Sequence, residues 1–259
     1  MKLKLSIIAG ALALAVSAQA NAGIAGASTT VGGGDLILSV WDTTSATSYT
    51  EDLGISLSSF LASPTTPLSV AADANMTTFL SGATASTTVW NLAAMASGTA
   101  FSAYNFLSTA AAGTTPSAIS NATVKTYNSS TDGFMAAVAL AAGTANSVVV
   151  ANSANPTAYA GGTTWGSNFG GKANFSNAAG LGVSQSFFSL KPSSASGIGQ
   201  ATVTAFANPV TLSTTGTLSI GTVAAVPEPG EWALMLSGFG LVGFIAARRK
   251  KMNTSIAFA

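Results

Sequence analysis

The stretch GGGDLILSVWDTTSATSYTEDLGISLSSFLA, residues 32–62, decides the fold of this chain. Its segment LILSVW, residues 36–41, alternates between two sets of side chains, which predicts a strand that is buried on one face and partly covered on the other. The turn residues DTTS at 42–45 separate it from the segment SYTE at 48–51, so a hairpin is expected. A short helix is expected to begin within residues 58–61.

The rest of the middle of the chain also favours strands. β-Branched residues with turn residues between them occur in SVVVANS (147–153), ATVTAFANPVTL (201–212) and TGTLSIGTVAAV (215–226). The segment STDGFMAAVALAAG (130–143) predicts a helix that is capped by Thr131 or Asp132 and stopped by Gly143. These patterns predict a mainly β, sandwich-like domain with one or two short helices.

The N-terminus has the three parts of a secretory signal peptide. Lys2 and Lys4 come first, the apolar stretch Leu5–Val16 follows, and small residues end the segment at Ala22. We therefore expect residues 1–22 to be a signal peptide and residues 23–225 to be an exported domain rich in Ala, Ser, Thr and Gly.

The charge and residue content of the exported part exclude several functions. Three lysines stand against six acidic residues, which leaves a net charge of −3 and no basic patch for nucleic acid. The chain has no Cys and no His, so disulfides, Cys/His zinc sites and His-dependent triads are excluded. We expect no metal, no cofactor and no enzymatic activity. Surface charge is the favoured interpretation of the six acids, and a carboxylate-dependent hydrolase is a less favoured alternative.

Two features leave alternatives open. Trp41 and Trp165 are candidate ligand-binding aromatics of a carbohydrate-binding module, although isolated aromatics in an Ala-rich chain favour core positions. The glycosylation sequon N-x-[ST] occurs in the exported part at four asparagines, which are Asn75, Asn121, Asn128 and Asn174.

The C-terminal part combines an extended segment, an apolar helix and a basic cluster. In residues 226–231, Pro227, Glu228 and Pro229 form a stiff, extended stretch. Residues 232–247 are uncharged and predict a transmembrane helix of about 24 Å, with Trp232 at one interface. Four basic residues follow this helix: Arg248, Arg249, Lys250 and Lys251. They predict that the helix stops at the cytoplasmic face of the membrane and that residues 252–259 form a cytoplasmic tail.

The sequence VPEPGEWALMLSGFGLVGFIAARRKK, residues 226–251, resembles the PEP-CTERM sorting signal of Gram-negative bacteria. The resemblance implies processing by exosortase, a membrane-embedded enzyme, with Pro227, Glu228 and Pro229 as the recognition element. It also implies a precursor in the inner membrane with its domain in the periplasm, and a processed protein at the cell surface or in the extracellular matrix. Proteins with this tail are associated with exopolysaccharide, biofilm and floc formation. The segments DLILSVWD (35–42) and SYTEDLGISLSSFL (48–61) also resemble N-terminal regions of uncharacterised proteins that carry this tail.

Together these observations predict an exported, exosortase-sorted structural protein of the cell surface or matrix. Its expected partners are the general secretory machinery, an exosortase-type enzyme and exopolysaccharide. A carbohydrate-binding module in the matrix is the alternative function.

Overall fold

The computed structural model describes Ile24 and residues 33–221, and within them the chain forms strands, three α-helices and short 3-10 turns. The strands are β1 Asp35–Asp42, β2 Thr47–Ser56, β3 Leu68–Val70, β4 Thr88–Ala96, β5 Asn105–Ala110, β6 Ser147–Ala151, β7 Ala179–Gly180, β8 Gln185–Pro192, β9 Ala201–Leu212 and β10 Leu218–Ile220. The helices are α1 Leu57–Ala62, α2 Ala74–Gly82 and α3 Asn121–Ala142.

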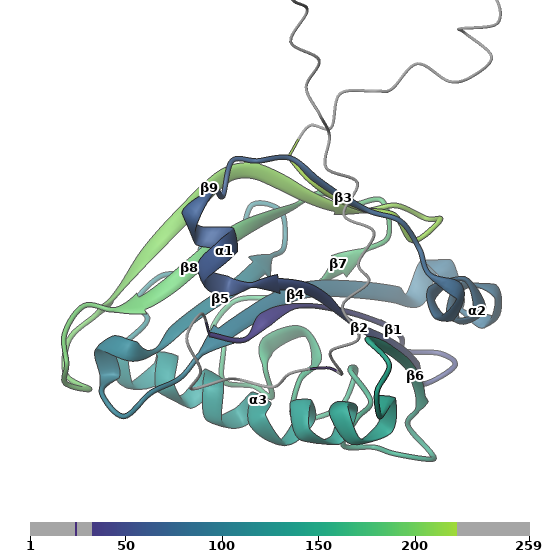
Figure 1. Ribbon diagram of the computed structural model, residues 1–259, viewed down its shortest axis with the longest axis horizontal. Coiled ribbons are helices and arrows are strands. Elements are labelled where there is room, and N and C mark those ends of the chain that lie inside the picture. Colours follow the sequence, from purple (N-terminus) through teal and green to yellow (C-terminus); the bar gives the residue numbers. More distant parts are fainter. Residues whose placement is uncertain (1–23, 25–32, 222–259) are drawn as a thin grey trace, which may run out of the picture. The chain divides into compact units, whose positions relative to one another are not determined.

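All of these strands join one antiparallel sheet. Its order is β3-β10-β9-β8-β5-β4-β1-β2-β6, and the short β7 pairs with β4 off this path. The sheet curls into a half-barrel. In Figure 1, β8, β9 and β3 arch over β4 and β1, which lie near the middle of the sheet order. The expectation of a mainly β fold is confirmed, whereas a single curled sheet replaces the two stacked sheets of a sandwich.

The two faces of this sheet carry two separate hydrophobic cores. The inner core lies inside the curl and contains Leu36, Leu38 and Val40 of β1 together with Phe60 of α1 and Phe79 of α2. The helix core lies on the other face, where α3 covers the sheet (Figure 1). The alternation in β1 explains both, because Ile37 and Trp41 point away from the inner core and into the helix core.

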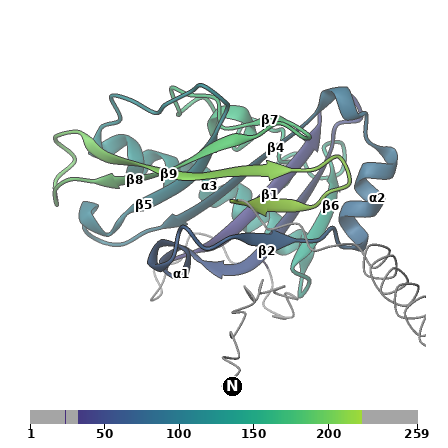
Figure 2. The same cartoon turned by 90° about the horizontal axis from the view of Figure 1, so that it is seen from above.

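Of the two small helices, α2 lies at one end of the half-barrel and α1 lies toward the other end, as both views show (Figures 1 and 2). α1 follows β2 directly and begins after Ser56, whose hydroxyl accepts a hydrogen bond from the Ser59 amide. α2 begins after Asp73, whose carboxylate accepts from the Met76 amide. The short helix expected at 58–61 is confirmed, and α2 is a helix that sequence patterns did not reveal.

The first hairpin has the expected strands. β1 and β2 are antiparallel, and Val40 faces Tyr49 across the pair. Asp42 fixes the turn, because its buried carboxylate accepts hydrogen bonds from the amides of Thr44 and Ser45. The same carboxylate accepts from the Thr84 amide and the Thr87 hydroxyl, so it also ties the segment before β4 to the turn.

α3 differs from the expected helix at its start. It begins at Asn121, nine residues before the predicted segment, because Ser120 supplies the N-terminal cap with its hydroxyl. Thr131 is therefore inside the helix, where its hydroxyl donates to the Tyr127 carbonyl instead of capping a terminus. The predicted stop is confirmed, since Gly143 ends the helix with a φ of 63°.

Of the other expected strands, β6 and β9 are found where the β-branched residues predicted them. In the segment 215–226 only Leu218–Ile220 forms a strand, and residues 222–226 lie outside the described part of the chain. The whole sheet lies within the described residues 33–221, which together with Ile24 contain both cores, so this part of the chain is expected to fold as a domain.

Candidate functional site

The predicted sorting residues lie outside the described part of the chain. This applies to the signal peptide 1–22 and to the tail 226–259, including Pro227, Glu228, Pro229, Trp232, Arg248, Arg249, Lys250 and Lys251. Among the residues that the structure does describe, none of the helices has the length and apolar character needed to span a membrane.

Trp41 and Trp165, the candidate ligand-binding aromatics, belong to the helix core. Their side chains are 2% and 0% exposed. Trp165 stacks on Phe134 of α3 with ring centroids 4.5 Å apart, and its indole nitrogen donates to Asn91 Oδ1 at 3.0 Å. Gly161 lies so close to Trp41 that an added Cβ would be 2.6 Å from the indole. A sugar could stack on either ring only if the core opened.

The structure divides the four sequon asparagines into two pairs. Asn121 and Asn128 are buried on α3, whereas Asn75 and Asn174 are exposed. The Asn121 amide donates to Ser194 Oγ and to the carbonyls of Ser196 and Ile198, which holds the connection between β8 and β9 against the start of α3. Asn121 is therefore a structural clamp rather than a modification site.

Two of the acidic residues approach each other beside the inner core. Glu51 of β2 accepts a hydrogen bond of 2.7 Å from the Tyr49 hydroxyl. Asp73, before α2, accepts from the Met76 amide at 2.6 Å and from the Ser147 hydroxyl of β6. This cluster therefore connects the start of α2 with β2 and with the edge strand β6.

Burial controls the protonation of this cluster. Loss of solvent around Glu51 raises the pKa of its carboxyl to about 7; the hydrogen bond from Tyr49 opposes the rise, and the charges of Asp73 and Asp52 add to it. Burial and the neighbouring Glu51 and Asp73 raise the pKa of the Tyr49 hydroxyl far above its usual range, so it remains a donor. Glu51 is only 4% exposed, which keeps this carboxyl pair away from a polymeric substrate.

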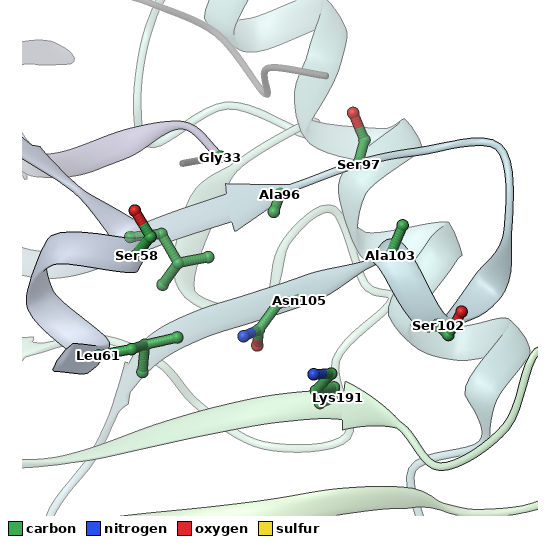
Figure 3. A pocket seen from close by; sticks show the side chains of 10 residues that line it. Gly33, Ser58, Leu61, Ala96, Ser97, Ser102, Ala103, Asn105 and Lys191 are labelled. Carbon is green, nitrogen blue, oxygen red and sulfur yellow. The ribbon is translucent and has the colours of Figure 1, made fainter. Parts of the chain in front are cut away.

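One hollow of the described domain lies at the α1 end of the half-barrel. It has a volume of about 290 Å³, and its wall comes from five parts of the chain: Gly33, α1, the end of β4 with Ser97, the residues 102–105 and the end of β8 (Figure 3). Figure 3 shows Asn105 of β5 between Leu61 of α1 and Lys191 of β8. No sequence pattern pointed to this hollow, because each part contributes only one to three residues and the parts are far apart in the sequence.

The wall of this hollow includes one ammonium, one side-chain amide and three hydroxyl groups. Lys191 is exposed and makes no ion pair with any residue in the described ranges. The Asn105 carbonyl oxygen already accepts from the Ser189 hydroxyl at 2.9 Å, which leaves the amide nitrogen available. Within residues 33–221 no group of three or more His, Cys, Asp or Glu side chains is placed to hold a metal ion.

Comparison with known proteins gives one result, and it concerns the tail. The PEP-CTERM protein-sorting motif matches residues 225–250. No curated protein and no solved structure matches the chain. The motif implies an exported, membrane-processed cell-surface protein that is acted on by an exosortase. The resemblance seen in the sequence is thus confirmed, and the chain carries a PEP-CTERM protein-sorting motif at residues 225–250.

Proposed function

We propose that this chain is a structural, non-enzymatic protein of the cell surface or extracellular matrix, where it is associated with exopolysaccharide during biofilm or floc formation. The general secretory machinery exports it, and an exosortase processes it at the tail. The observation that carries this proposal is the PEP-CTERM motif at residues 225–250, which follows directly on a compact unit ending at Val223.

The described domain supports a structural role over the alternatives. Among the described residues, Glu51 and Asp73 are close enough for their charges to interact, and Glu51 is almost fully buried, which disfavours a carboxylate-dependent hydrolase. The burial of Trp41 and Trp165 removes the aromatic platform on which a carbohydrate-binding module would depend. The domain is instead stabilised by two cores on one continuous sheet.

Mass spectrometry of the C-terminus tests the sorting step. In cells with an active exosortase, the recovered protein is expected to end near Pro227–Pro229, and in cells without the enzyme it should retain its tail. A triple variant with alanine at Pro227, Glu228 and Pro229 should retain the tail in both. An intact, identical C-terminus in the two wild-type samples would contradict the proposal.

The structural role needs a separate measurement. Deletion of the gene is expected to reduce aggregation and retention of the matrix, and the wild-type gene should restore both. The triple alanine variant is a matched control, because it leaves the sheet domain unchanged and fails only in sorting. Unchanged matrix retention after deletion would show that the protein has no structural role there.

A further inference from the structure

The hollow at the α1 end has a composition suited to one chemical class of ligand. Two hydrogen-bond donors, the Lys191 ammonium and the Asn105 amide nitrogen, lie on neighbouring strands β8 and β5, which pair in the sheet. Ser58, Ser97 and Ser102 also line the hollow, and the Ser58 hydroxyl shares a hydrogen bond of 3.2 Å with Ser56 Oγ. Leu57 and Leu61 add an apolar wall. The second hollow of the domain, about 240 Å³ beside Gln185, has no charged side chain in its wall.

The charge of the hollow is positive in an otherwise acidic domain. Lys191 is one of three lysines in residues 23–225, and no acidic side chain lines the hollow. The acid nearest to the lining residues along the chain is Asp35, two positions after Gly33, and it is not part of the wall. A ligand with a carboxylate would meet an ammonium and an amide donor without a competing anion from the wall.

The hydroxyl and apolar groups extend this match beyond a simple anion. Serine hydroxyls both donate and accept, which suits the hydroxyls of a sugar, and leucine side chains suit the C–H face of its ring. A single ammonium with one amide donor matches the charge of one carboxylate. Because a lysine also attracts phosphate as a point charge, inorganic phosphate is a probe in the test below.

We propose that this hollow binds a sugar acid, a uronate unit of an acidic polysaccharide, with its carboxylate at Lys191 and Asn105 and its hydroxyls at Ser58, Ser97 and Ser102. This inference rests on the proposed function, since it names the class of polysaccharide that the surface protein would contact. It differs from the alternative based on Trp41 and Trp165, because the ligand is held by donors at the rim and not by stacked aromatics.

Calorimetric titration of the full chain tests the proposal, in a nonionic detergent without a sugar head group. The probes are oligogalacturonate, a neutral glucose oligomer of the same length and inorganic phosphate. We expect binding of the oligogalacturonate alone, weakened about tenfold or more by Lys191→Met and by Asn105→Asp. Asn105→Asp preserves the size of the side chain and puts a negative charge where the amide nitrogen was.

Lys172→Met is the matched control, since Lys172 is an exposed lysine that does not line the hollow. It should leave the affinity unchanged, and circular dichroism should show that all variants are folded. Equal binding of the neutral oligomer, equal binding of phosphate, an unchanged affinity of Lys191→Met or no binding at all would each overturn the proposal. Processing of the tail by exosortase is measured separately, so a failure of binding with normal processing would leave the proposed sorting intact.

Discussion

The hydroxyl of Tyr49 donates a 2.7 Å hydrogen bond to Glu51 Oε2, two residues farther along β2, and both side chains are shut off from solvent. The two residues point to the same face of the strand because side chains alternate along it. On that face they meet the start of α2, where Asp73 is bound by the Ser147 hydroxyl of β6. A buried acid thus lies where three elements join.

Glu51 is expected to make the stability of the domain depend on pH. Its folded-state pKa, about 7, is above its usual value of 4.5, so protonated Glu51 stabilises the fold fully below pH 4.5. This contribution is lost as the pH rises through about 7 and amounts to about 3 kcal/mol. Glu51→Gln mimics the protonated acid and should therefore equal the wild type near pH 4.5 and exceed it at pH 8.

Urea unfolding of a fragment of residues 23–223, followed by circular dichroism from pH 4 to 8, measures this difference. Asp132→Asn is the control, because Asp132 is an exposed carboxyl on α3. Its removal should leave most of the pH dependence of the free energy of unfolding in place. The same pH slope in the wild type and in Glu51→Gln would show that Glu51 is not the group responsible.

Asp42 is expected to give domain stability a pH dependence opposite to that from Glu51. Burial would raise the pKa of its carboxyl, but the hydrogen bonds from Thr84, Thr87, Thr44 and Ser45 outweigh burial and hold the pKa well below its usual range. The stability from ionised Asp42 is therefore present above pH 3.8 and is lost as the pH falls below that value.

Asp42→Asn should destabilise the domain at pH 7 by about 2 to 4 kcal/mol, because the new amide nitrogen cannot accept the hydrogen bonds of one carboxylate oxygen. Urea midpoints at pH 7 and pH 3 measure this effect. The difference in midpoint between Asp42→Asn and the wild type should be smaller at pH 3 than at pH 7. A neighbouring surface change, Thr43→Ala, should cost far less. Equal midpoints for Asp42→Asn and the wild type at pH 7 would contradict the prediction.

Asn121 is expected to be essential for the connection between β8 and β9. Asn121→Asp retains the shape of the side chain but turns a donor toward the oxygens of Ser194, Ser196 and Ile198 into an acceptor. We expect a loss of about 3 kcal/mol or more in the free energy of unfolding. Asn152→Asp, at an exposed asparagine directly after β6, is the control and should change stability little. Similar losses in the two variants would refute the special role of Asn121.

The three tryptophans of the fragment, Trp41, Trp90 and Trp165, are each at most 2% exposed. Their fluorescence should therefore be blue-shifted and resist quenching by iodide, and oligosaccharides should not change it. Urea should restore full quenching when the cores open. Strong quenching of the folded fragment would show that an indole ring is accessible, and it would restore the aromatic platform as a candidate site.

Local patterns predicted the elements whose contacts are close in sequence. The alternation of LILSVW gave β1, the β-branched run gave β9, and Gly143 gave the end of α3. Asp73 was a readable cap signal for α2, and the paired phenylalanines at 187–188 marked β8, but neither pattern was long enough to stand out. The start of α3 depended on Ser120, which lies before the apolar periodicity.

The arrangement of the elements could not be predicted in the same way. A sandwich and a half-barrel share the same short alternating strands and differ in which strands pair. Here Phe106 of β5 pairs with Leu190 of β8, across more than eighty residues, and this pairing joins the two halves into one sheet. The donor-lined hollow arises from the same long-range pairing, because it brings Asn105 and Lys191 to the same end of the sheet.

The alternation of β1 has a consequence for how the domain unfolds. Since Leu38 belongs to the inner core and Ile37 to the helix core, β1 cannot leave one core without opening the other. Heat or denaturant should therefore melt both halves in a single cooperative transition, with the amides of the central strands exchanging their hydrogens only through global opening. A protein built in this way has no half-folded form in which one core survives alone.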